Sequence, residues 1–195
     1  MALLGVAMTD VSEWTPSAAV RTVLLALAND AEVESWQPKW PLSGCTRLTA
    51  LDCSGLKQLA TVGSWLSYCT RLTALDCTGL KQLATVGDWW LSGCTSLTAL
   101  DCTGLEQLAT VGAYWLFSCP SLTALDCTGL KQLATVGSYW LSYCTSLTAL
   151  DCTGLKELAT VGSCWLSGCT SLQALLASAD FQAARVSRRR TTRGG

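Results

Sequence analysis

The chain has 195 residues, and half of them are hydrophobic, which is enough apolar material for a continuous core and excludes a disordered chain. It contains no histidine, the side chain most often used for proton transfer near neutral pH, so the composition disfavours Ser/His and Cys/His hydrolases. The last eleven residues hold five of the 13 basic side chains and no acid, so the rest of the chain has eight bases against 14 acids.

The N-terminal residues 1–40 are predicted to form a capping segment. Thr15 and Pro16 suit the N-cap and first positions of a helix, which helix formers then continue over 16–29. The opening lacks the basic region of a signal peptide, and the longest apolar run, 23–28, is far shorter than the roughly 20 residues that span a membrane. We therefore expect no transmembrane segment and a cytoplasmic protein, or a surface or secreted one if the chain is a fragment without its native N-terminus.

A sixteen-residue phrase, LTALDCTGLKQLATVG, recurs with few changes along the middle of the chain. Its copies begin at Leu48, Leu72, Leu97, Leu122 and Leu147, and a partial sixth begins at Leu172. The first step is 24 residues and the others are 25, a period that indicates a solenoid. Apolar spacings of four and then two predict a short strand at the start of each copy, and spacings of three predict tight turns after it. The segment ATVGDWWLSGC fits one or two helical turns with Val86, Trp90 and Cys94 on one side.

The phrase LTALDCTGL resembles the opening of a leucine-rich repeat, L-x-x-L-x-L-x-x-N/C-x-L, with cysteine in the third leucine position. The continuation LATVGxxWLxxCTSL is similar to the cysteine-containing and BspA-like surface-antigen classes, and the likeness runs from Cys45 to about Leu176. It implies an α/β solenoid: a leucine-rich repeat superhelix with one short parallel strand per 24–25-residue repeat on its concave face, and helical N- and C-terminal flanks. Leucine replaces the family's asparagine, as at Leu80, and the Thr78 column is expected to cap the backbone groups that asparagine would serve.

Three regions follow from this pattern. Residues 41–176 form the solenoid, with five full repeats and a partial sixth, because a repeat must stack on its neighbours to bury its apolar side. Residues 1–40 cap one end, and residues 177–195 comprise the end of a C-terminal helix and a basic disordered tail.

The twelve cysteines fall into two rows and one exception. The first cysteine row is Cys53, Cys77, Cys102, Cys127 and Cys152, and the second is Cys45, Cys69, Cys94, Cys119, Cys144 and Cys169. We interpret both as reduced core positions in preference to disulfides or to zinc ligands, because zinc sites use close pairs such as C-x2-C. No metal or cofactor is expected. Cys164 stands where other copies have an aromatic residue, which predicts an exposed thiol.

The aspartate row is Asp52, Asp76, Asp101, Asp126 and Asp151. Each aspartate lies between two inward positions of the predicted strand, so the row should face the concave surface. With charges near 5 Å apart, neighbours repel by about 0.8 kcal/mol at the dielectric constant of water. The row is our candidate binding strip for a basic peptide or protein; the alternative is that duplication copied a tolerated, solvated charge.

Tryptophan recurs with the core leucines, and we interpret this tryptophan row as packing. It consists of Trp65, Trp90, Trp115, Trp140 and Trp165. The adjoining aromatic column, Trp89, Tyr114, Tyr139 and then Cys164, is predicted to point outward on the second limb of the repeat. Its aromatic members are alternative partner-binding residues, because exposed aromatic side chains often anchor interfaces, although they could equally cover their own neighbours.

Together these features predict a non-enzymatic protein–protein interaction module or scaffold, since stacked repeats offer area and no irregular polar cluster suggests a catalytic site. The alternative is a structural spacer, or a surface-antigen or adhesion fragment, with no specific ligand. The Arg-rich end could bind nucleic acid or an acidic membrane, but without interleaved aromatic residues a solvated tail is favoured. The oligomeric state stays open.

Overall fold

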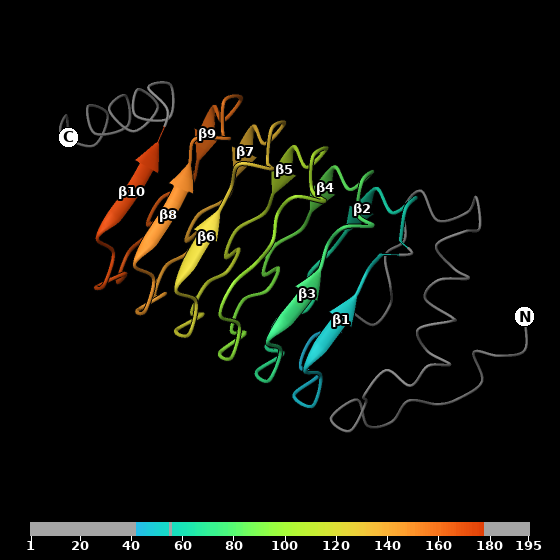
Figure 1. Ribbon diagram of the computed structural model, residues 1–195, viewed down its shortest axis with the longest axis horizontal. Helices are drawn as coiled ribbons and strands as arrows, with labels where there is room; N and C mark the ends of the chain where they lie inside the picture. Colours follow the sequence, from blue (N-terminus) through green and yellow to red (C-terminus); the bar gives the residue numbers. More distant parts are fainter. Residues whose placement is uncertain (1–41, 55, 178–195) are drawn as a thin grey trace, which may run out of the picture.

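A computed structural model describes residues 42–54 and 56–177, and within them each repeat copy forms one coil of a β-solenoid (Figure 1). The strands form two layers. The first layer consists of β1 (Ala50–Asp52), β3 (Ala74–Asp76), β6 (Ala124–Asp126), β8 (Ala149–Cys152) and β10 (Ala174–Ala177). The second layer consists of β2 (Thr61–Val62), β4 (Thr85–Val86), β5 (Thr110–Val111), β7 (Thr135–Val136) and β9 (Thr160–Val161).

All recorded strand pairs are parallel, and each joins equivalent residues of neighbouring coils. The second layer is one continuous five-stranded sheet, β2-β4-β5-β7-β9. The first layer is divided into β1-β3 and β10-β8-β6. The third coil joins the latter through a bridge between Asp101 and Asp126 and through a hydrogen bond from the Thr123 N–H to the Thr98 carbonyl (3.1 Å). The predicted parallel strand per repeat is thus confirmed for most coils, and the second strand was not predicted.

The alternation of side chains in the first layer explains its position. In β3, Leu75 is buried while Ala74 and Asp76 are exposed, and the following Cys77 is buried again. This is the period-2 pattern of a strand with one face on the core and one in solvent. The core between the layers is built from the leucines, valines, tryptophans and cysteines of the repeat.

Glycines in the turn after the first strand allow neighbouring coils to stack closely. A Cβ atom built on Gly104 would lie 2.0 Å from the carbonyl oxygen of Cys77, and one on Gly129 would lie 2.5 Å from that of Cys102. No side chain fits at such distances, so these positions require glycine for close packing against the preceding coil.

The prediction of helical turns in ATVGDWWLSGC is wrong. Thr85 and Val86 form β4, and the return limb after it, residues 87–96, alternates into the left-handed region at Trp89 (φ 67°), Leu91 (φ 55°) and Gly93 (φ 69°). The alternation turns successive amides toward opposite neighbours: the Trp89 N–H donates forward to Ala113 (2.8 Å), and the Leu91 N–H donates back to Trp65 (3.2 Å). Left-handed residues other than glycine cost roughly 1–2 kcal/mol each, and bonds to two neighbouring coils offset this cost.

The structure therefore replaces the α/β assignment by strands and turns within the described residues. The predicted helical flanks, 16–29 and the segment after 177, lie outside these residues. In the part of the chain that the structure describes, there is no helix long and apolar enough to cross a membrane.

Candidate interaction surfaces

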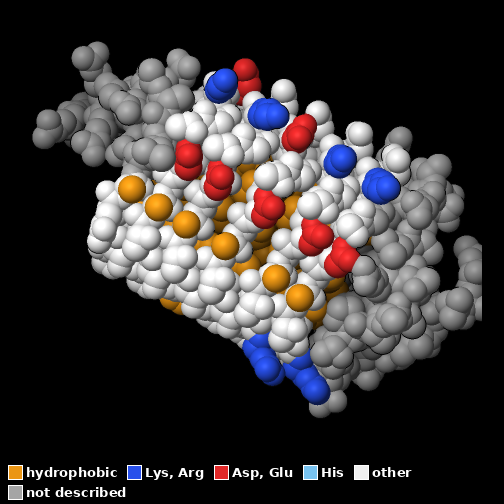
Figure 2. Space-filling view, in the orientation of Figure 1, with side chains coloured by type: hydrophobic (Ala, Val, Ile, Leu, Met, Phe, Trp, Pro, Cys, Tyr) orange, Lys and Arg blue, Asp and Glu red, His pale blue; other side chains and the backbone are white. Residues whose placement is uncertain are grey.

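The structure places the aspartate row on the outward face of the first layer (Figure 2). Asp52 is in register with Asp76, and Asp126 is in register with both Asp101 and Asp151. Their side chains are exposed or half-buried. Parallel register brings equivalent carboxylates about 4.8 Å apart from strand to strand, so the predicted strip of negative charge is present on this face.

Each aspartate also closes a local turn, which we did not predict. The Oδ1 atom accepts a hydrogen bond from the backbone N–H two residues later, at 2.8 Å in every coil. This is an Asx turn, in which a short acidic side chain replaces a backbone acceptor. In this turn the aspartate is the acceptor and Thr78 supplies the amide, while the capping role that we expected of the Thr78 column stays a prediction.

Hydrogen bonding also favours the ionised form of at least one member of the row. The side chain and backbone of Thr128 hold the pKa of Asp126 below its usual value. Among the described residues, no ion pair involves Asp76, Asp101, Asp126 or Asp151, although exposed lysines line the edge of the same face (Figure 2). These four aspartates are thus charges available to a ligand, held in place by local backbone bonds.

The aromatic column lies on the return limbs, and its rings stack on one another. The Trp89 and Tyr114 ring centroids are 3.9 Å apart with an interplanar angle of 4°, and those of Tyr114 and Tyr139 are 4.8 Å apart at 3°. All three side chains are half-buried, and Cys164 at the end of the column is exposed as predicted. The rings thus cover their neighbours and still reach solvent, and partner binding by the column stays a prediction.

Further aromatic side chains extend this surface beyond the predicted column. Phe117 packs nearly perpendicular to Tyr114 (5.4 Å, 81°), and Tyr143 packs nearly perpendicular to Phe117 (5.6 Å, 77°). Tyr143 is 52% exposed. Phe117 occupies a column that holds serine in the other coils, so its departure from the repeat was the available signal. The column of Tyr143 holds tyrosine also in the first coil, at Tyr68, and glycine or serine in the others.

The cysteine rows are core positions, as predicted. Ten of the twelve thiols are buried, Cys169 is half-buried, and no disulfide joins any of them. Burial raises the pKa of Cys77 and of Cys94 to about 12, which keeps both thiols protonated at neutral pH. In the described part of the chain, no group of histidine, cysteine or acidic side chains is arranged to hold a metal ion.

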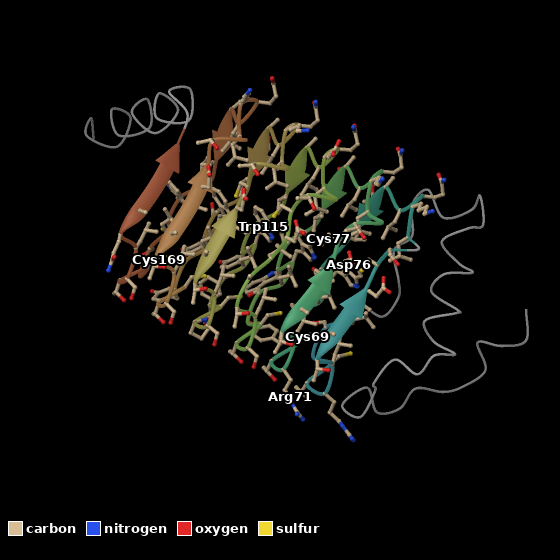
Figure 3. The ribbon with its side chains drawn as sticks, in the orientation of Figure 1. Cys69, Arg71, Asp76, Cys77, Trp115 and Cys169 are labelled. Carbon is tan, nitrogen blue, oxygen red and sulfur yellow. The ribbon has the colours of Figure 1, made fainter. Side chains whose placement is uncertain are left out.

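The second cysteine row has a structural role that the sequence did not reveal. The Cys94 and Cys119 thiols each donate to the carbonyl of a left-handed leucine in the preceding coil, Leu66 and Leu91, at 3.1 Å. The same bond recurs at Cys144 and Cys169, and Cys69 donates to the carbonyl of Leu42; Cys69 and Cys169 are labelled in Figure 3. A buried carbonyl without a donor costs about 1–3 kcal/mol, so the thiols stabilise the unusual backbone of the return limb.

The tryptophan row packs in the core, as predicted. Trp115 is fully buried between Trp90 and Trp140, with ring centroids 5.6 and 5.5 Å away (Figure 3). The Nε1 atoms of these three residues have no hydrogen-bond partner. The row therefore contributes apolar contact and aromatic stacking, with an unsatisfied donor in each of these indoles.

No protein-family model matches the sequence, and no curated protein matches it significantly. Among solved structures, the chain is similar to a leucine-rich repeat protein from Bacteroides ovatus ATCC 8483, at 17% identity over 68% of this chain and 50% of that chain, with a TM-score of 0.26. It is also similar to TLR13 in its complex with ssRNA13, at 15% identity over 67% and 31% of the two chains, with a TM-score of 0.18. A third similar structure is the functional domain of InlJ from Listeria monocytogenes, described as including a cysteine ladder. Its values are 18% identity, 67% of this chain, 50% of that chain and a TM-score of 0.11.

The coils are consistent with a repeat protein of the leucine-rich-repeat type. This conclusion rests on the stacked parallel strands and the leucine spacing of each coil. The TM-scores are too low for any residue of this chain to be matched to a residue of these structures. The chain spans half or less of the length of these three structures. The leucine-rich-repeat type describes the architecture only, and neither candidate surface is assigned a ligand by it.

Proposed function

We propose that the protein is a non-enzymatic protein–protein interaction module or scaffold, and that its aspartate row binds a basic segment of a protein partner. One observation supports this proposal above the others: exposed or half-buried carboxylates recur along one face, one in each full coil, and they are in register in the recorded pairs. A solenoid offers such a face as an extended surface in place of a pocket, which suits an elongated ligand.

The geometry of each carboxylate is compatible with binding. The recorded hydrogen bonds of Asp76 and Asp101 use Oδ1, which leaves Oδ2 of these exposed side chains for a ligand from solvent. A lysine or arginine along the row would neutralise the repulsion between neighbouring aspartates as well as form an ion pair. Because every coil presents the same residues, the favoured ligand is a regular or loosely basic segment.

The spacer function is the competing proposal, and the Asx turns favour it. A residue that closes a turn in every coil has a structural reason to recur, whether or not anything binds it. An experiment must therefore remove the charge and keep the turn. Asparagine does this, because its side-chain oxygen can accept the same backbone hydrogen bond.

The test is the binding of fluorescein-labelled octa-arginine, measured by fluorescence anisotropy at low salt. We expect the triple variant Asp76→Asn, Asp101→Asn and Asp126→Asn to bind about tenfold more weakly than wild type or worse, since each exposed ion pair contributes up to about 1 kcal/mol. The control carries Asp88→Asn, Glu106→Gln and Glu157→Gln, which remove the same net charge from positions outside the row.

If the two triple variants weaken binding equally, net charge alone attracts the peptide and the row is not a binding site. The natural partner would be sought by capture from a native lysate, with wild type beside a variant in which all five row aspartates are asparagine. A partner held by the first and lost by the second supports the interaction module. Absence of any specific capture supports the spacer.

A further inference from the structure

We propose that two copies of this chain associate through an aromatic patch on the return limbs. The patch consists of Trp89, Tyr114, Phe117, Tyr139 and Tyr143. This surface shares no residue with the aspartate row, so the inference does not depend on the proposed function.

The patch is continuous, and its rings are already ordered in the single chain. Trp89, Tyr114 and Tyr139 form one stack, while Phe117 lies nearly perpendicular to both Tyr114 and Tyr139 at 81° and 84°. Tyr143 adds the most exposed ring at the side of the patch. Rings fixed in this way lose little side-chain entropy on association, which is the usual advantage of tyrosine and tryptophan in interfaces.

Ring orientation makes the patch complementary to itself. Members of the stack cover each other's faces, so solvent meets them mainly at their edges, while Phe117 provides a ring in the perpendicular orientation. Aromatic pairs favour the meeting of an electropositive edge with an electronegative face. Two copies therefore bring both orientations to a shared interface.

Charge directs the association of two copies to this patch and away from the aspartate row. The return limbs 87–96, 112–121, 137–146 and 162–171 contain no Lys, Arg or Glu, and their one acid is Asp88, whose Oδ1 accepts a bond from the Ala113 N–H at 2.7 Å. An identical partner necessarily brings identical charges, so two aspartate rows would repel each other across an interface. On the aromatic patch two copies meet without that repulsion, and interface cores are depleted of charge in the same way.

Two-fold symmetry is the simplest closed arrangement for such contacts. With the axis near Tyr114 and Tyr139, the two stacks run in opposite directions, and the Cys164 end of one faces the Trp89 end of the other. Cys164 is the one exposed thiol, whereas ten of the others are buried. Its reactivity toward a maleimide therefore reports whether the end of the column is covered.

The first measurement is sedimentation velocity of the full chain between about 1 and 100 µM, with reductant present to exclude disulfide-linked dimers. We expect wild type to shift from monomer to dimer over this range, and the double variant Tyr114→Ser and Tyr139→Ser to raise the dissociation constant at least about tenfold. Asp101→Asn, in the aspartate row and outside the patch, serves as the control and should behave as wild type. Circular dichroism of each variant establishes that the coils remain folded.

The second measurement uses wild type alone and so does not depend on a variant that folds. The rate at which a maleimide labels Cys164, followed by mass spectrometry of the peptide, should fall as the protein concentration rises through the dimer range. A monomer up to about 100 µM would overturn the proposal. An unchanged dimer in the tyrosine variant, or a Cys164 rate independent of concentration, would overturn it equally.

Discussion

Removing the aspartate side chains and removing only their charge should have different effects on stability. We consider two triple variants at Asp76, Asp101 and Asp126, one with alanine and one with asparagine. Wild-type Oδ1 accepts the amide of the residue two positions later at 2.8 Å at each site. Asparagine retains that acceptor, and alanine leaves the amide to water.

The expected magnitude follows from the hydrogen bonds. Replacing an analogous side-chain cap by alanine costs about 1 kcal/mol, and these sites are exposed, so three of them give about 2–3 kcal/mol between the two variants. The charge effect is smaller: neighbouring carboxylates repel by about 0.8 kcal/mol in water, roughly halved at physiological salt. At Asp126 the hydrogen bonds from Thr128 outweigh this repulsion, because the pKa of its carboxyl is lowered.

Urea denaturation of the wild type and both variants, followed by tryptophan fluorescence, would measure the free energies of unfolding. We expect the alanine variant to unfold at the lowest urea concentration, and the difference between wild type and the asparagine variant to depend on salt. If the alanine and asparagine variants unfold at the same urea concentration, the Asx turns do not stabilise the coils.

Three further outcomes are expected. Gly104→Ala should lower the free energy of unfolding by more than about 3 kcal/mol or prevent folding, because its Cβ would lie 2.0 Å from the Cys77 carbonyl oxygen; thermal melting beside Thr103→Ala checks this. Trp115→Ala should lower the free energy of unfolding by about 3–5 kcal/mol, because it leaves a cavity in the stack. Trp115→Phe should lower it clearly less, because it keeps a ring and removes an unpaired Nε1. Urea denaturation of both variants checks this, and a less stable Trp115→Phe would contradict it. Burial raises the pKa of Cys77 to about 12 in the folded chain. The thiol therefore ionises at a lower pH in the unfolded chain, and the free energy of unfolding falls as pH rises from about 9 toward 12. Melting under reductant should show this decline, and a Cys77→Ala variant should show less of it.

The period of the sequence predicted the solenoid and most of its buried positions. Leu75 and Cys77 alternate with Asp76, and this pattern is enough to orient a strand when one face is buried and the other is not. The stacking of Trp90 on Trp115 follows from the same reasoning, since a constant 25-residue step brings equivalent residues together. These features depend on spacing alone, so a single sequence contains them.

The return limb could not be predicted in this way. Trp89, Trp90 and Leu91 are compatible with a helix when considered locally, and their left-handed alternation is stabilised by partners a whole coil away. The hydrogen bond from the Cys94 thiol to the Leu66 carbonyl joins residues 28 positions apart, and no pattern within one copy predicts it. Tertiary contacts thus overrode local preference in the part of the coil where the backbone bonds to two neighbours at once.

For the candidate surfaces, the sequence predicted which side chains are exposed and which lie in register, but it did not predict the hydrogen bonds and ring contacts that they make. The aspartates lie on the outward face because their neighbours point inward, but the Asx turn depends on the conformation of the following residue. Phe117 joins the aromatic surface because it breaks the repeat, and its contact with Tyr143 becomes clear only when the coils are stacked.

The close approach of Gly129 to Cys102 repeats that of Gly104 to Cys77, so each coil offers its neighbours the same two surfaces. An extra 25-residue copy inserted between existing ones would meet contacts that are already suited to it. The number of coils can therefore change without altering the kind of contact that each coil makes. An added copy like the third or fourth coil would extend both the row of carboxylates and the row of aromatic rings by one step.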